Sequence, residues 1–109
     1  MNDITIPEIT ESEWINRPQQ EKPSGDKEAL FFFTPFCGTC KLTEKMLNIV
    51  LETGTIIPVS KININYAPFL RDSWKISSVP CLVILQDGNP IEIQYAMSSV
   101  VDLHRFLQG

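Results

Sequence analysis

The stretch that most constrains the fold is a nearly unbroken apolar run, Ala29–Thr34. A strand with one face in water alternates apolar and polar side chains, and this run does not, so we expect a strand buried on both faces. Cys81–Leu85 has the same character. With helical patterns between the strands, these runs predict β-α-β units, which form a parallel sheet with helices on both faces, plus one antiparallel hairpin. The fold class is therefore α/β.

The sequence Cys37-Gly38-Thr39-Cys40 lies where the first of these strands gives way to an amphipathic helix. Two cysteines three positions apart at a helix start face the same side, so their sulfurs can close a disulfide or open to two thiols. Cys37 would lie among the unpaired N–H groups at the positive end of the helix dipole, and both stabilise a thiolate. This placement indicates a redox motif.

Composition favours one globular domain and excludes several protein classes. The chain has 109 residues, 43% of them hydrophobic and 20% charged, so we expect a single domain over 1–109. A net charge of −4 without a basic cluster argues against a nucleic-acid or anionic-membrane partner. No apolar run approaches the ~20 residues that span a bilayer. The first residues lack a basic n-region and an apolar h-region, so we expect a cytoplasmic protein.

Cysteine and histidine usage argues against a metal centre. The three cysteines are an odd number, which does not suit a structural disulfide framework. A closed zinc site needs four ligands, and the chain offers only Cys81 and His104 besides the Cys37–Cys40 pair. An iron–sulfur cluster lacks a fourth thiolate unless a dimer supplies it. We therefore expect no metal. Thiol–disulfide exchange by the Cys37–Cys40 pair would need no organic cofactor either.

Strong signals mark the first helix. Thr10 and Glu13 form a predicted capping box, with Ile9 and Trp14 as a hydrophobic staple. This helix should end near Arg17-Pro18 or shortly after. Outside it we expect a short strand at 4–6 and a polar loop over 19–27.

Periodicity and turn residues predict the remaining elements. The helix after Cys37 should stop at Gly54 and bury one stripe of side chains, namely Leu42, Met46, Ile49 and Val50. Asp87-Gly88 should form a hairpin turn, after which apolar and polar residues alternate as in a strand with one solvated face. The other expected elements are a strand at 56–62, a helix at Pro68–Trp74, a loop at Ser77-Ser78, a strand through Ile91, Ile93 and Tyr95, and a helix capped by Ser99 with the stripe Val100, Leu103, Phe106 and Leu107.

The resulting order, β-α-β-α-β-α-β-β-α, resembles the thioredoxin family over nearly the whole chain. Phe36-Cys37-Gly38-Thr39-Cys40 follows the second strand, and Val79-Pro80 precedes the fourth, 40 residues beyond the second cysteine. The resemblance implies a thioredoxin fold with a central mixed sheet of four to five strands flanked by helices. It also implies a cis Val79–Pro80 bond against the disulfide, where an ordinary trans proline at a strand start is the alternative.

The resemblance further implies which residues face a substrate. The implied groove comprises Phe36, Gly38, Thr39, Val79, Pro80 and Ala96. Lys61 corresponds to a lysine near the buried side of the family's active site, where it would favour a thiolate if it lies close. Gly88 corresponds to the family's hairpin glycine.

Three departures from the family pattern bear on the chemistry. Phe36 and Thr39 replace the tryptophan and proline around the family's cysteines. Phe31 replaces a buried aspartate that helps to deprotonate the second cysteine, so water or another group must take that proton. Ala96 replaces a groove glycine and is followed by Met97, which predicts a narrower and more apolar groove.

Several other side chains have both a structural and a functional interpretation. Phe36, beside Cys37, should be exposed enough to contact a substrate. Cys81 should be a small buried hydrophobe, the alternative being a third thiol that traps one of the pair. His104 is expected on the surface of the last helix, and both tryptophans are expected to be packing residues.

These features favour a monomeric thiol–disulfide oxidoreductase of the thioredoxin-like class. By resemblance, Cys37 attacks a protein or small-molecule disulfide and Cys40 resolves the mixed disulfide, with electrons from an unidentified reductase or low-molecular-weight thiol. Two alternatives stay open: a redox-inactive module that binds partners at Val79–Pro80, and a redox sensor that switches a partner. Turnover of a general disulfide substrate separates the first function from the other two.

We expect the reduction potential of the Cys37–Cys40 pair to lie between about −270 mV, the thioredoxin value, and about −200 to −230 mV, the glutaredoxin range. By family analogy, the inner proline that Thr39 replaces accompanies the more reducing potentials. Thr39→Pro should therefore lower the potential, measured by equilibration with glutathione buffers. A wild-type potential at or below about −270 mV would contradict this role of Thr39.

Overall fold

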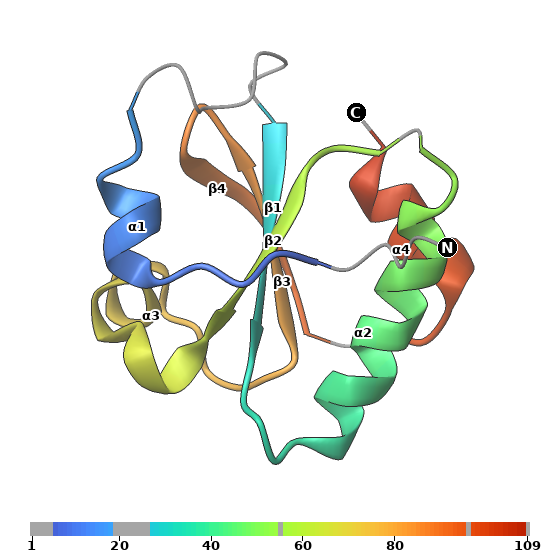
Figure 1. Ribbon diagram of the computed structural model, residues 1–109, viewed down its shortest axis with the longest axis horizontal. Helices are drawn as coiled ribbons and strands as arrows, with labels where there is room; N and C mark the ends of the chain where they lie inside the picture. Colours follow the sequence, from blue (N-terminus) through green and yellow to red (C-terminus); the bar gives the residue numbers. More distant parts are fainter. Residues whose placement is uncertain (1–5, 19–26, 55, 96, 109) are drawn as a thin grey trace.

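A computed structural model describes residues 6–18, 27–54, 56–95 and 97–108. The strands and helices follow the predicted order from the first helix onward (Figure 1). In chain order they are α1 (Glu11–Ile15), β1 (Lys27–Phe33), α2 (Gly38–Leu51), β2 (Val59–Asn63), the 3-10 turn η2 (Ile64–Tyr66), α3 (Pro68–Trp74), β3 (Cys81–Gln86), β4 (Asn89–Gln94) and α4 (Val100–Leu107).

The strands form a mixed sheet with the order β2-β1-β3-β4. β1 runs parallel to β2 and antiparallel to β3, and β3 pairs with β4 in the antiparallel hairpin. The two central strands are buried from Glu28 to Phe32 and from Cys81 to Leu85. The prediction that both apolar runs are strands covered on both faces is therefore confirmed.

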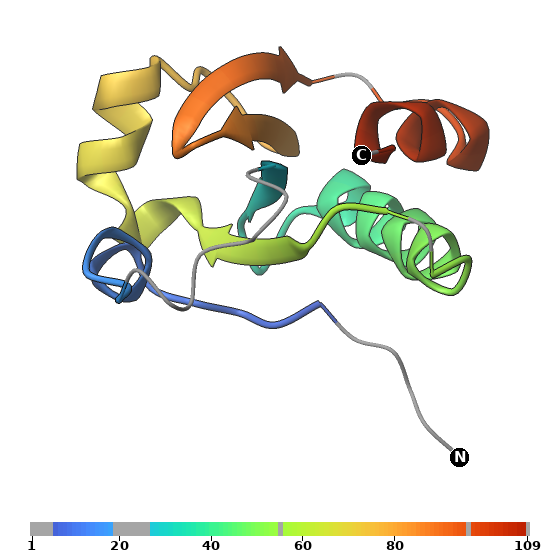
Figure 2. The ribbon, with the colours of Figure 1, turned by 90° about the horizontal axis from the view of Figure 1, so that it is seen from above.

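Helices cover both faces of the sheet, with α2 and α4 on one face and α1 and α3 on the other (Figure 2). Side chains of β1 alternate between the faces: Ala29 and Phe31 pack toward α2 and α4, whereas Leu30 and Phe32 pack toward α1 and α3. The domain thus has two cores separated by the sheet. Cys40 belongs to the first core and Cys81 to the second.

The N-terminal segment differs from its prediction. Of the strand expected at 4–6, residues 4 and 5 lie outside the described part, and Ile6 is buried without belonging to a strand. The next residues bond to β2, because the Lys61 N–H donates to Pro7 O and the Ile9 N–H donates to Lys61 O, both at 2.9 Å. The loop expected at 19–27 also lies outside the described residues, apart from Lys27, which begins β1.

The strand predicted over 56–62 is shorter in the structure, where it forms β2. Its first apolar residues bond to the end of α4 instead of the sheet. Ile56 forms an isolated bridge with Gln108, and the Ile57 N–H donates to Leu107 O at 2.9 Å. These residues therefore attach the C-terminal helix to the domain.

α2 buries a stripe that agrees only in part with the predicted one: Val50 is buried and Met46 packs against the core, as expected. Leu42 and Ile49 are 58% and 53% exposed, although both were expected in the core. Both stripes have helical spacing, so the pattern alone did not decide between them. Cys40, Leu47 and Val50 pack in the core with side chains of the sheet, and this packing sets the rotation of the helix. The buried residues are Cys40, Thr43, Leu47 and Val50.

The predicted caps are confirmed. Thr10 Oγ1 accepts from the Glu13 N–H at 3.0 Å, and Glu13 Oε1 accepts from the Thr10 N–H at 2.8 Å. α1 is shorter than expected, since it ends at Ile15 instead of near Arg17-Pro18. Also present are the cap at Ser99, the helix Pro68–Trp74, positive φ at Gly54 after α2, and the turn at Asp87-Gly88 with φ of 54° and 81°.

α1 is attached to the sheet by a buried ion pair. Glu28 of β1 is 7% exposed, and its carboxylate accepts hydrogen bonds from the Arg17 guanidinium at 2.8 and 2.9 Å. Arg17 lies over the Trp14 ring, 5.0 Å from its centroid. Trp14 meets Trp74 edge-on at 5.5 Å, and Trp74 meets Phe32 of β1 at 6.1 Å. Both tryptophans are therefore packing residues, as predicted.

Arg17→Ala should lower the free energy of unfolding by about 2 kcal/mol, because the Glu28 carboxylate would remain buried without its hydrogen-bond donor. The double variant Arg17→Met, Glu28→Gln should lose less, since it removes both charges and keeps similar volume. Urea unfolding followed by tryptophan fluorescence measures both. Equal losses in the two variants would show that the unpaired Glu28 carboxylate is not the source of the destabilisation.

Candidate active site

Strand pairing gathers the candidate residues at one end of the sheet. Phe32, near the end of β1, pairs with Cys81 at the start of antiparallel β3. The loop that leaves β1 toward Cys37 therefore lies beside Val79–Pro80, which leads into β3. The parallel neighbour β2 ends at the same side, where η2 follows it (Figure 1).

Cys37 and Cys40 form a disulfide at the start of α2, with their Cα atoms 5.2 Å apart. Cys37 is the N-cap residue, and the Cys40 N–H donates to Cys37 Sγ at 3.1 Å. Cys37 is half-buried, whereas Cys40 is 2% exposed. A substrate can thus approach the Cys37 sulfur, while Cys40 contacts the core.

Several donors favour a thiolate at Cys37. Its sulfur accepts from a backbone N–H of the first helical turn, where the helix dipole is positive. The Thr39 hydroxyl lies 3.3 Å from the same sulfur, within hydrogen-bond distance. Such groups stabilise the negative charge that makes a cysteine nucleophilic. Thr39 therefore contributes a polar contact that proline could not make.

The Val79–Pro80 bond is cis, as the resemblance implies. Val79 packs against the core that contains Cys40. Pro80 and Thr39 both line an open groove of about 310 Å³ between α2 and the segment after β4. The other lining residues are Leu42, Thr43, Met46, Tyr95, Met97 and Ser98.

The apolar character of this groove explains why Leu42 is exposed. Leu42 and Met46 line it from α2, and Met97 lines it from the opposite side, as the predicted apolar groove requires. Sequence analysis missed Leu42 and Met46 as groove residues because helical spacing placed them in the core. Both residues follow Cys40 within two turns of α2, and this closeness to the redox motif is the sequence signal that could have identified them as groove residues. Ala96, predicted in the groove, lies outside the described residues.

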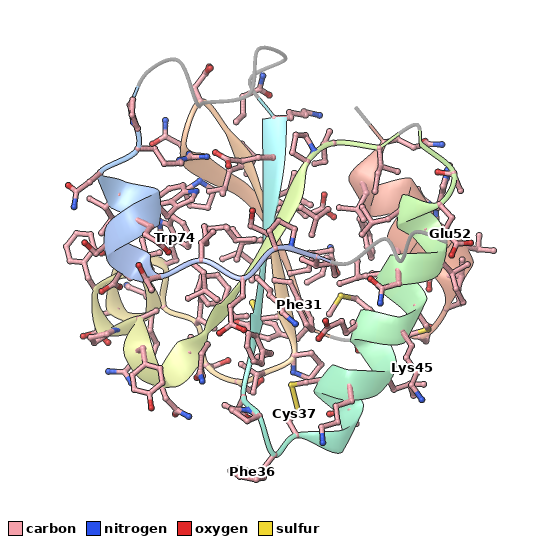
Figure 3. All side chains as sticks on the ribbon, viewed as in Figure 1. Phe31, Phe36, Cys37, Lys45, Glu52 and Trp74 are labelled. Atoms are coloured by element: carbon pink, nitrogen blue, oxygen red, sulfur yellow. A yellow bond between two sulfur atoms is a disulfide. The ribbon has the colours of Figure 1, made fainter. Side chains whose placement is uncertain are left out.

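The remaining predicted groove residues lie beside the disulfide but do not line the groove. Phe36 is 99% exposed at the tip of the loop before Cys37 (Figure 3). Gly38 is the first residue of α2 and is exposed. Phe36 is therefore available to a partner, in agreement with its expected exposure.

Lys61 forms an ion pair with a carboxylate of α2. Its Nζ lies 2.6 Å from Glu44 Oε2 of α2 and 5.3 Å from the centre of the Phe33 ring. Phe31, fully buried, stacks on Phe33 at 6.5 Å between centroids. Glu44 of α2 thus places a negative charge beside Lys61, where Phe31 carries none.

Cys81 lies on the opposite face of the sheet from the disulfide. It is fully buried in the core on the α3 side, and burial raises the pKa of its thiol to about 12. The buried-hydrophobe interpretation therefore agrees with the structure, and the trapping alternative does not. His104 is half-exposed on α4, 3.3 Å from Gln108.

The described part of the chain contains neither a metal-binding cluster nor a membrane-spanning helix. Within residues 6–18, 27–54, 56–95 and 97–108, no group of three or more histidine, cysteine or acidic side chains is placed to hold a metal ion. None of the helices in these ranges has the length and apolarity needed to cross a membrane.

Comparisons with known proteins agree with this geometry. The profile of the Thioredoxin family matches residues 8–108. The "Thioredoxin-like protein YusE" of Bacillus subtilis is 37% identical over 83 residues, which cover 76% of this chain and 78% of that protein. A "Thioredoxin" of Chlamydia trachomatis is 28% identical over 61 residues, covering 56% of this chain and 60% of that protein. The solved structure of a mutant thioredoxin from Halobacterium salinarum aligns with a TM-score of 0.74 at 21% identity, over 98% of this chain and 91% of its own. The predicted fold is confirmed.

Cys81 should stay unmodified in the native protein. With a pKa of about 12, its thiol is protonated throughout the neutral range and becomes a thiolate only as the pH approaches that value. Iodoacetamide treatment of the reduced protein near pH 8, followed by peptide mass spectrometry, should label Cys37 and spare Cys81. Labelling of Cys81 should appear after unfolding in guanidinium. Comparable native labelling at both cysteines would contradict the assigned burial.

Proposed function

Because this chain belongs to the thioredoxin family and is a thiol–disulfide oxidoreductase, we propose that it works as a reductase of disulfide-containing proteins. The observation that carries the proposal is the unequal exposure of the two sulfurs. Cys37 lies half-exposed at the N-cap of α2, and Cys40 is buried one turn further on. This arrangement supports Cys37 as the attacking thiol and Cys40 as the resolving thiol.

The reaction is two successive exchanges. The Cys37 thiolate attacks one sulfur of the substrate disulfide, the substrate S–S bond breaks, and the released substrate thiolate takes a proton. The Cys40 thiolate then attacks Cys37 Sγ and releases the second substrate thiol. The substrate gains two electrons and two protons, and the Cys37–Cys40 disulfide is the oxidised product. A reductase or a low-molecular-weight thiol must return the two electrons.

The groove beside the disulfide supports an extended protein segment as substrate. Leu42, Met46 and Met97 present apolar surface next to Thr39 and Pro80. Methionine side chains adapt to different partners, which suits a site that accepts more than one sequence. In this proposal Phe36 contacts the substrate on the other side of the Cys37 sulfur. Val79 would offer backbone groups to the bound segment.

The proposal includes a cytoplasmic location and a monomeric state for the protein. A cytoplasmic protein with a reduced, buried Cys81 would keep its redox chemistry confined to the Cys37–Cys40 pair. A monomer would leave both sides of the sulfur open to a protein substrate. The redox-sensor and binding-module alternatives predict no sustained turnover with a general disulfide substrate.

Cys37→Ser should abolish reduction of a disulfide-linked protein by the dithiol form. Cys40→Ser should retain the first exchange and accumulate a mixed disulfide on Cys37, visible as a mass increase that dithiothreitol reverses. Cys81→Ala is the matched control and should turn over at the wild-type rate. If Cys40 proves the thiol that alkylates first near pH 7, the two roles are reversed.

A further inference from the structure

Resolution of the mixed disulfide requires a buried thiol to lose its proton. Cys40 is 2% exposed and belongs to the core between the sheet and α2. Burial disfavours a thiolate, as the raised pKa of Cys81 in the other core illustrates. The proposed function needs the Cys40 thiolate, so a base near α2 is required. Phe31, which lies in the same core, carries no group that could serve.

Glu44 is the single carboxylate within α2, and it lies one helical turn after Cys40. Residues four apart on a helix are neighbours on one face, with Cβ atoms about 5–6 Å apart. Glu44 is also turned toward the sheet, because its Oε2 lies 2.6 Å from Lys61 Nζ of β2. The carboxylate therefore lies between α2 and β2, on a side of the helix that adjoins the buried Cys40.

Lys61 is held in place from several sides. It pairs with Phe31 in the β1–β2 register, and its Nζ lies 5.3 Å from the centre of the Phe33 ring. Its backbone is bonded on the other side to Pro7 and Ile9. The side chains of Lys61 and Glu44 are 19% and 26% exposed. The pair thus combines a fixed position with contact to water.

We propose that Glu44 accepts the proton of Cys40 during resolution of the mixed disulfide, and that Lys61 is the positioning residue for Glu44. The proton passes from Cys40 Sγ to the Glu44 carboxylate as the sulfur attacks Cys37. It then leaves to solvent from Glu44, whose carboxylate is far more exposed than the sulfur. This inference rests on the proposed function, because only a resolving Cys40 needs the base.

The other charged groups near Glu44 do not replace it. Lys41 and Lys45, on the neighbouring turns of α2, are exposed cations (Lys45 is labelled in Figure 3). Glu8, in the segment bonded to Lys61, is exposed. Glu52 follows the last residue of α2, about 18 Å along the helix from Cys40, and is exposed (Figure 3). Glu52 therefore provides a matched carboxylate without access to the sulfur.

The test separates the two exchanges by stopped-flow mixing of the reduced protein with 5,5′-dithiobis(2-nitrobenzoate). Attack by Cys37 releases the first coloured thiolate, and attack by Cys40 on the mixed disulfide releases the second. Glu44→Gln should leave the first phase unchanged and slow the second about tenfold or more near pH 7. The deficit should shrink above about pH 9, where hydroxide deprotonates Cys40 directly. Glu52→Gln should leave both phases unchanged.

A double variant distinguishes a role of Glu44 in proton transfer from a purely structural role of the Glu44–Lys61 ion pair. Glu44→Gln with Lys61→Met removes both charges and should stay slow in the second phase, because the base is still missing. Lys61→Met alone should slow the second phase less than Glu44→Gln. Recovery of the wild-type rate in the double variant, or an unchanged second phase in Glu44→Gln, would overturn the inference. Loss of the first phase in the wild type would instead contradict the proposed function.

Discussion

The pairing of β1 with β3 is the constraint on which the rest of the structure depends. Both strands are buried on both faces, so each must satisfy its backbone groups within the sheet. The register that places Phe32 opposite Cys81 brings the end of one strand beside the start of the other. Thr39 of the C-x-x-C motif and Pro80 line one groove because these two ends are aligned. Burial of the central strands thereby fixes where the Cys37–Cys40 motif and Pro80 lie.

The same sheet separates two thiol environments. Cys40 packs into the core under α2, and Cys81 packs into the core on the α3 side. In a strand, successive residues point to opposite faces, so Cys81 is turned away from the disulfide although Pro80 precedes it. The sheet thus confines redox exchange to one pair and leaves the third cysteine protonated.

Three sides of α2 make three different kinds of contact. One side, with Leu47 and Val50, packs in the core. A second side, with Leu42 and Met46, lines the groove. On the third side, Glu44 forms an ion pair with Lys61. These assignments follow from the rotation of the helix, which the packing of its buried side chains against the sheet fixes.

The sequence by itself determined the order of elements, the two doubly buried strands, the capping box at Thr10 and the C-x-x-C motif between strand and helix. Each of these depends on local spacing or on burial that the residue types reveal directly. The tertiary structure decided which stripe of α2 is buried, that the residues before β2 attach to α4, and that Lys61 pairs with Glu44. Those outcomes depend on helix rotation and on contacts between residues far apart in sequence, such as the 17 positions between Glu44 and Lys61. Local periodicity carries no information on either, because two stripes of one helix can have the same spacing and different neighbours.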